Sequence, residues 1–113
     1  MVKTRMLKMN YEFNRVYRKG KYLHSKTLTL YYRPRGDQKN RLGITVSRKV
    51  RGSVKRNRLK RQLREIYRLN EHMIPDGWDI VLLGRLDPEQ TDYAQMNGDY
   101  LRLINRAKLD RHE

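Results

Sequence analysis

The chain has 113 residues, enough for one hydrophobic core and too few for two. It carries 27 Lys and Arg against 12 Asp and Glu, which leaves a formal net charge of +15. A charge of this size attracts polyanions, so nucleic acid is the first candidate partner and an anionic membrane surface the second. No apolar run approaches the ~20 residues of a membrane span, and no apolar signal segment is seen. We therefore expect a cytoplasmic protein without a membrane partner.

The absence of cysteine excludes disulfides, thiolate catalysis and Cys-based zinc sites. His24, His72 and His112 are scattered, with no partner at metal-ligand spacing. We therefore predict no metal site and no cofactor in the protein itself.

A single domain is expected over residues 1–113, with a basic tail at residues 1–8 and a charged end at residues 109–113. The first predicted element is a short helix with Asn10 as its N-cap. Phe13, Val16 and Tyr17 share its apolar face, and Gly20 stands where it would end.

Residues 27–33 and 41–47 alternate apolar and polar side chains, which is typical of half-buried strands. The turn signal Pro34-Arg35-Gly36-Asp37 separates them, so we expect the two strands to form an antiparallel pair. The Tyr22-Leu23 region is a candidate edge strand.

A long helix is predicted from Ser53, as N-cap, to about Asn70. Its buried face is predicted from the spacing of Leu59, Leu63, Ile66 and Tyr67.

Residues 78–83 include the contiguous apolar run 80–83, which predicts a strand buried on both faces at the centre of the sheet. The last helix is predicted to start with Asp87 as N-cap, Pro88 at N1 and Gln90 at N3. Gly98 interrupts its period, so its continuity is left open.

Nine cations and no acid lie between Arg48 and Arg64. At about 100° per residue, Asn57, Arg61, Arg64 and Arg68 fall on the face opposite the apolar residues, with Arg58 and Lys60 on its flanks. A charge run is most often a solvated helix face, but such a face usually mixes signs and gains i,i+4 pairs. Here like charges lie one turn apart, and the start of the helix adds a phosphate site. We therefore favour binding to a polyanion.

Exposed rings among basic residues would stack on the bases of single-stranded nucleic acid. Tyr31 lies on the strand face that also carries Thr29 and Arg33, and Phe13 and Tyr17 form a stripe on the first helix. Core packing is the stronger alternative for Phe13, and the two roles are evenly balanced for Tyr31. The other rings that follow apolar periodicity are assigned to the core or its edge: Tyr67, Trp78, Tyr93 and Tyr100.

No set of residues is spaced for catalysis. Asp76, Asp79 and Asp87 form the only acidic cluster of note, and a turn and a helix cap account for two of them. The protein alone is not expected to be an enzyme.

Two motifs closely resemble the bacterial ribonuclease P protein family: RLGITVSRK at residues 41–49 and VKRNRLKR at residues 54–61, with the Arg-Asn-Arg core of the family signature intact. The likeness extends over about residues 5–108 through Phe13, Gly20, Tyr31 and residues 77–81. Tyr17 stands where Phe is frequent, and Arg51 where many relatives have Gly.

The resemblance implies an α/β fold, a two-layer α+β sandwich in the order helix, three strands, helix, strand, helix. It implies a four-stranded, mostly antiparallel sheet with a left-handed β-α-β crossover, against the general rule of handedness. The implied contacts to a catalytic RNA are Arg48, Lys49, Lys55, Arg56, Asn57, Arg58, Lys60, Arg61, Arg64 and Arg68. A cleft for the single-stranded leader of precursor tRNA is implied at Phe13, Tyr17, Tyr31 and Arg33.

By this resemblance the expected function is that of an RNA-binding subunit of ribonuclease P, an endoribonuclease whose RNA removes the 5′ leader from precursor tRNA. The RNA would cut the phosphodiester and hold the divalent Mg²⁺, so no catalytic side chain is assigned to this chain, and no DNA partner is expected. A ribosomal-type or RNA-chaperone binding module is the alternative. A protein-only nuclease that uses Asp76, Asp79 or Asp87 carries little weight.

Overall fold

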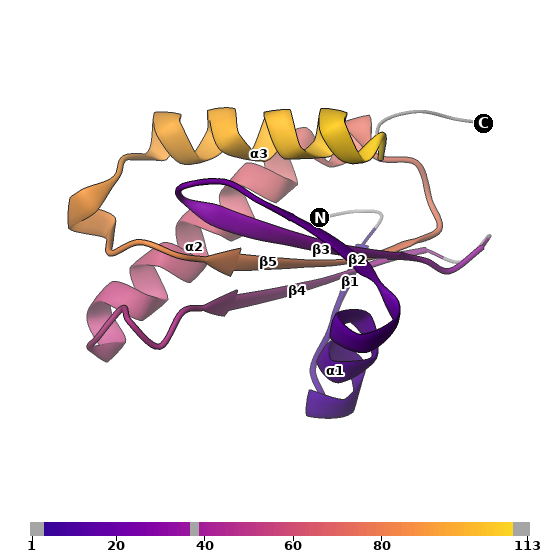
Figure 1. Ribbon diagram of the computed structural model, residues 1–113, viewed down its shortest axis with the longest axis horizontal. Coiled ribbons are helices and arrows are strands. Elements are labelled where there is room, and N and C mark those ends of the chain that lie inside the picture. The colour runs from indigo at the N-terminus through magenta and orange to yellow at the C-terminus, as the bar shows by residue number, and fades with distance from the viewer. Residues whose placement is uncertain (1–3, 37–38, 110–113) are drawn as a thin grey trace.

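A computed structural model describes residues 4–36 and 39–109 of the chain (Figure 1). Its elements in chain order are β1 (Thr4–Met6), α1 (Asn10–Lys19), β2 (Lys21–His24), β3 (Leu28–Pro34), β4 (Asn40–Val46), α2 (Ser53–Asn70), η1 (Glu71–Met73), β5 (Trp78–Gly84), η2 (Pro88–Gln90) and α3 (Tyr93–Ala107). Parts of the predicted basic tail and charged end, with Asp37 and His112, lie outside the described residues. None of the described helices is both long and apolar enough to cross a membrane.

The sheet has five strands in the order β1-β4-β5-β3-β2, so the predicted four-stranded sheet is wrong. The additional strand, β1, lies in the predicted basic tail and pairs parallel with β4, with Thr4 opposite Asn40. Its three residues show no apolar alternation that would predict a strand. They form one because they pair with the edge of β4. β1·β4 and β4·β5 are parallel whereas β5·β3 and β3·β2 are antiparallel, so the sheet is evenly mixed and not mostly antiparallel.

The predicted antiparallel pairing of the strands at residues 27–33 and 41–47 is also wrong, because β5 lies between β3 and β4. Leu82 of β5 is opposite Leu30 of β3 and Ile44 of β4. The apolar residues of β5 are buried on both faces, and the strand takes the predicted central position. The turn after β3 packs against the turn before β5: the Arg35 N–H donates to the Gly77 carbonyl at 2.6 Å.

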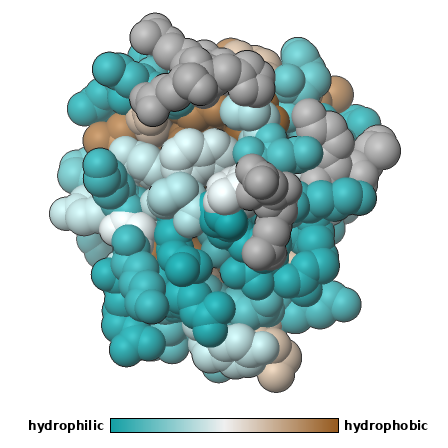
Figure 2. Space-filling model, turned by 90° about the vertical axis from the view of Figure 1, so that its right-hand side faces the viewer, coloured by the Kyte–Doolittle hydropathy of each residue, from teal (hydrophilic) through white to brown (hydrophobic). Residues whose placement is uncertain are grey.

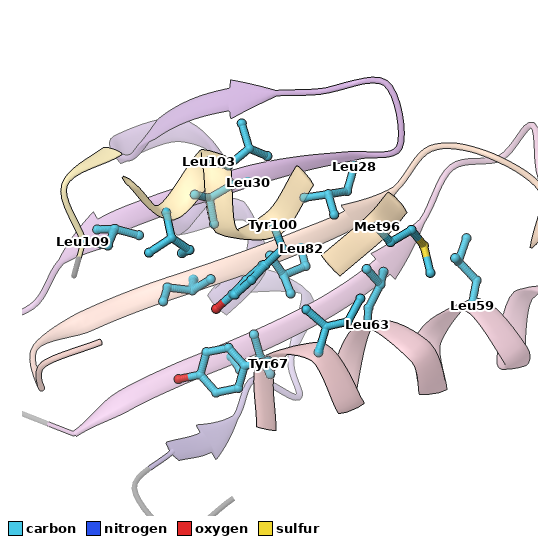
Figure 3. Close-up of a cluster of buried hydrophobic side chains, with 14 of the residues drawn as sticks. Leu28, Leu30, Leu59, Leu63, Tyr67, Leu82, Met96, Tyr100, Leu103 and Leu109 are labelled. Atoms are coloured by element: carbon cyan, nitrogen blue, oxygen red, sulfur yellow. The ribbon is translucent and has the colours of Figure 1, made fainter. Parts of the chain in front are cut away.

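Helices cover both faces of the sheet, so the predicted two-layer sandwich becomes three layers (Figure 1). The predicted buried face of α2 is confirmed, because its apolar residues are fully buried with Leu28, Leu30 and Leu82 of the sheet and with α3 (Figure 3). A smaller cluster of Leu7, Val16 and Val81 lies on the opposite face, beneath α1. α1 therefore packs on the opposite face of the sheet from α2 and does not cover the outer side of α2.

The starts of the three helices differ from their predicted positions by one or five residues. Met9 and Gly52, rather than Asn10 and Ser53, are the N-caps of α1 and α2. Asp87 caps the short η2, and α3 begins after Asp92, whose carboxylate accepts from the Gln95 N–H at 2.7 Å. The helix then continues through Gly98. Both Asp87 and Asp92 precede the apolar period, and the sequence alone does not show which of them caps the longer helix.

Candidate nucleic-acid interface

The outer face of α2 carries the predicted cationic stripe. Leu59, Leu63 and Ile66 have no exposed surface, and the residues opposite them are exposed: Asn57, Arg58, Arg61, Arg64 and Arg68. The stripe is therefore directed at solvent and not at the protein's own sheet.

Some cations of this segment have acidic partners within the protein. Lys55 Nζ lies 3.0 Å from Asp87 Oδ2 and 3.5 Å from Glu89, and its hydrogen bond to Asp87 raises the pKa of Lys55. Arg68 Nε donates to Glu65 at 3.0 Å, which raises the pKa of Arg68. Over the described ranges, no acid pairs with the remaining cations of α2's exposed side: Arg58, Lys60, Arg61 and Arg64. The positive charges of these four side chains are therefore not compensated by a described acidic residue.

Arg56 belongs to the same motif but has an internal role. Its guanidinium donates to the carbonyls of Ser47 at 2.8 Å, Val50 at 3.0 Å and Val46 at 3.1 Å. All three acceptors lie in the connection from the end of β4 to α2. Sequence reasoning placed Arg56 with the RNA-binding residues, because nothing local shows that a cation in the first turn of a helix reaches back to the preceding chain.

Three of the predicted leader-binding residues meet on the α1 face of the sheet. Tyr17 of α1 lies edge-on to Tyr31 of β3, with ring centroids 4.8 Å apart, and 6.4 Å from the ring of Phe13. Tyr17 is 39% exposed, and partial burial raises the pKa of its hydroxyl. A pocket of about 460 Å³ lies alongside α1. It is lined by Asn10, Phe13, Asn14, Tyr17, Ile44, Thr45 and Arg48.

The position of α1 over the sheet depends on Gly43 in the RLGITVSRK motif. A Cβ atom at Gly43 would lie 2.5 Å from Phe13 Cε1 and 3.1 Å from Leu7 Cδ1. The motif therefore needs a residue without a side chain, because the Phe13 ring occupies that space.

The other predicted contacts are distributed differently. Arg48, predicted to contact the catalytic RNA, lines the α1 pocket. Arg33, predicted at the leader, does not line this pocket and is 3.5 Å from Asp79. Tyr22, which sequence reasoning did not assign, is 61% exposed, 5.9 Å from the Tyr31 ring and stacked on His24. The cross-strand register that places it opposite Tyr31 could not be found from the short sequence of β2.

A buried network of charges lies at the N-terminal end of α1. Arg41 binds Asp79 through two hydrogen bonds of 2.8 and 2.9 Å and Glu12 at 3.1 Å. Asp79 has no exposed surface, and Arg33 and Arg35 also lie within 3.5 Å of it. Arg41, Asp79 and Arg33 occupy one row across β4, β5 and β3. Sequence reasoning grouped Asp79 with Asp76 and Asp87, but its carboxylate is neutralised by arginines.

Hydrophilic residues cover most of the molecular face shown in Figure 2, and the hydrophobic residues are confined largely to a band in its upper part.

Known proteins share this sequence and fold. The sequence profile of the family described as Ribonuclease P matches residues 1–108. The ribonuclease P protein component of Natranaerobius thermophilus is 41% identical over 103 residues, which cover 91% of this chain and 90% of that protein. That of Alkaliphilus metalliredigens is 39% identical over 109 residues and covers 96% and 98%.

Solved structures agree. The RNase P protein from Thermotoga maritima has a TM-score of 0.78 and 34% identity, covering 89% of this chain and 96% of that chain. A mutant RNase P protein from Staphylococcus aureus has a TM-score of 0.80 and 28% identity, covering 92% and 88%. The chain therefore belongs to the ribonuclease P protein component family and is a protein subunit of ribonuclease P.

Proposed function

We propose that this subunit binds the catalytic RNA of ribonuclease P through the outer face of α2 and the 5′ leader of precursor tRNA through the pocket beside α1. The observation that carries the proposal is the set of unpaired cations on α2: Arg58, Lys60, Arg61 and Arg64. Their mutual repulsion is relieved when phosphates replace the missing acids. The planar guanidinium also suits bidentate phosphate contacts.

The α1 pocket suits a single strand better than a duplex. The rings of Phe13 and Tyr17 line the pocket, the Tyr31 ring lies edge-on to Tyr17 beside it, and Arg48 supplies a cation at the rim for a phosphate. Unpaired bases can stack on such rings, whereas paired bases in a helix cannot reach them. The exposed ring of Tyr22 extends the same aromatic surface.

The two surfaces lie on opposite sides of the sheet, because α1 and α2 cover different faces (Figure 1). The subunit can therefore contact the catalytic RNA and the leader at the same time. In this arrangement it acts by raising the affinity of the RNA enzyme for precursor over mature tRNA.

Phosphodiester cleavage is assigned to the RNA partner and the Mg²⁺ that it binds. Asp79, the most deeply buried carboxylate of the described residues, does not fit a role as a Mg²⁺ ligand, because Arg41 already engages both of its oxygens. No side chain of this subunit is assigned to the chemical step.

The test is reconstitution. Purified protein is added to a bacterial ribonuclease P RNA at low magnesium, and removal of the leader from precursor tRNA is measured. Stimulation of cleavage supports the proposal. RNA binding without stimulation would favour a ribosomal-type or RNA-chaperone module, and cleavage without the RNA subunit would indicate a protein-only nuclease.

A further inference from the structure

A second hollow lies between α2 and the beginning of α3, away from the α1 pocket. It has a volume of about 460 Å³, and it is lined by Arg58, Arg61, Gln62 and Glu65 of α2 and by Tyr93 of α3. Tyr93 was predicted to belong to the core or its edge. Its ring does pack against the core, but it is only half-buried and also forms a wall of this hollow.

The residues around the hollow leave positive charge uncompensated. Glu65 is the only acid among those that line it, and Arg68 binds this carboxylate at 3.0 Å. Glu65 therefore does not neutralise Arg58 or Arg61, neither of which has an ion pair with a described acid. Both guanidinium groups are exposed and can accept an anion beside them.

The same residues also leave hydrogen-bonding capacity unused. In the part of the chain that the structure describes, the side-chain oxygen of Gln62 and the hydroxyl of Tyr93 are buried and have no hydrogen-bond partner. Buried polar atoms in native proteins normally have a partner, and each exception calls for an explanation. A ligand that carries N–H donors would supply a partner to the Gln62 oxygen after a small rotation of the side chain.

A nucleotide combines the properties that this hollow requires: a flat base for the Tyr93 ring, amino or imino donors for Gln62, and a phosphate for Arg58 and Arg61. The two arginines also continue into the cationic face with Lys60 and Arg64. A nucleotide within a bound RNA chain therefore reaches the hollow while its neighbours contact that face. Only an unpaired nucleotide exposes both its ring face and its base edge.

We propose that the hollow between α2 and α3 holds one unpaired nucleotide of the catalytic RNA, with Tyr93 as the stacking ring and Gln62 as the contact to the base edge. This inference rests on the proposed function of α2. The outer face of α2 otherwise recognises only phosphates. The hollow gives it a site that discriminates unpaired from paired RNA.

The test compares the affinities of five variants for a bacterial ribonuclease P RNA over a range of salt concentrations. We expect Tyr93→Leu to weaken binding by about 5- to 150-fold, because one base stack is lost. The slope of log affinity against log salt should not change, because the substitution removes no charge. Tyr93→Phe keeps the ring and should bind within about twofold of wild type, whereas Gln62→Leu should bind more weakly than wild type.

Tyr11→Leu is the matched control, since Tyr11 is 60% exposed on α1 and lines neither hollow. It should bind the catalytic RNA like wild type. Chemical probing of the RNA gives an independent readout: one unpaired nucleotide should be protected by wild type and become reactive with Tyr93→Leu, while the remaining footprint persists.

Wild-type affinity and an unchanged footprint for Tyr93→Leu would overturn the nucleotide site, while a loss of affinity in Arg58→Ala would leave the proposed function standing. Binding without any salt dependence would instead remove the proposed function. If circular dichroism shows that Tyr93→Leu has lost its structure, Gln62→Leu decides, because Gln62 lies outside both hydrophobic clusters. Wild-type affinity and protection in that variant would overturn the proposal.

Discussion

At the scale of single residues, Gly43 controls how closely α1 approaches the sheet. Because a Cβ atom there would lie 2.5 Å from Phe13 Cε1, Gly43→Ala should displace the ring and with it the pocket wall. We expect a loss of about 1–3 kcal/mol in the free energy of unfolding, measured in urea. The affinity for precursor tRNA should fall as well.

Gly98→Ala is the matched control for that substitution. A Cβ atom at Gly98 would meet only the end of the Arg102 side chain, at 3.5 Å, and the residue lies within α3. The change should stabilise the protein by up to about 1 kcal/mol through helix propensity. Equal effects of the two substitutions would contradict the close approach of Phe13.

Arg56 and Arg61 should separate stability from RNA binding. Arg56→Ala leaves the carbonyls of Ser47, Val50 and Val46 without their charged donor. We expect it to lower the free energy of unfolding by about 1.5–3 kcal/mol. Arg61→Ala should leave stability unchanged within about 0.5 kcal/mol, because Arg61 is exposed. Thermal and urea unfolding of the two variants measure this difference, and comparable losses would refute it.

Glu12 should make stability depend on pH. The backbone N–H groups of Lys8 and Met9 donate hydrogen bonds to its carboxylate. Together with the charges of Arg41 and Arg5, they hold the pKa of Glu12 below its usual 4.5. The unfolded chain therefore binds this proton more readily than the folded protein. The stabilisation is present above about pH 4.5 and is lost as the pH falls through the lowered pKa of the folded state.

The measurement is urea unfolding of wild type and Glu12→Gln from pH 7 down to pH 3. The advantage of wild type over Glu12→Gln should be largest at pH 7 and shrink below about pH 4.5. A constant difference over this range would show that the ionised carboxylate contributes nothing specific.

At the scale of elements, α2 has an inner face of leucine and isoleucine and an outer face of cations. Arg58→Ala and Arg61→Ala should each weaken binding to the catalytic RNA and reduce the steepness of its salt dependence by about 0.7–0.9. Lys55→Ala should change the slope less, because Lys55 is already paired with Asp87 and Glu89. Binding titrations at several salt concentrations measure these slopes, and equal slopes for all three variants would contradict the distinction.

At the scale of the whole molecule, the sheet separates the two proposed RNA surfaces. Tyr31→Ala should weaken binding of precursor tRNA by about 1–3 kcal/mol and leave binding of mature tRNA alone, because mature tRNA has no leader. Arg61→Ala should weaken assembly with the catalytic RNA. The free-energy effects of the two changes on holoenzyme affinity for precursor should add within about 0.5 kcal/mol.

That additivity is measured with the double variant in reconstituted holoenzyme. A strong interaction between the two changes would mean that the faces are coupled through the sheet. An equal loss for precursor and mature tRNA in Tyr31→Ala would contradict the assignment of the leader to the α1 pocket.

The sequence by itself determined the features that depend on local spacing. The two faces of α2 follow from a helical period, the central position of β5 from contiguous apolar residues, and the family from the RLGITVSRK and VKRNRLKR motifs. Each of these patterns lies within one segment of the chain. The same residues of that segment become buried whichever element packs against it.

Only the tertiary structure decided which distant segments meet. β1 is a strand because β4 offers it an edge, and β3 and β4 are separated because β5 is apolar on both faces. Tyr22, Arg56 and Asp79 acquire their surroundings from residues that are not their neighbours in sequence. The physical reason is that hydrogen-bond and charge partners are chosen by proximity in space, which local periodicity does not encode.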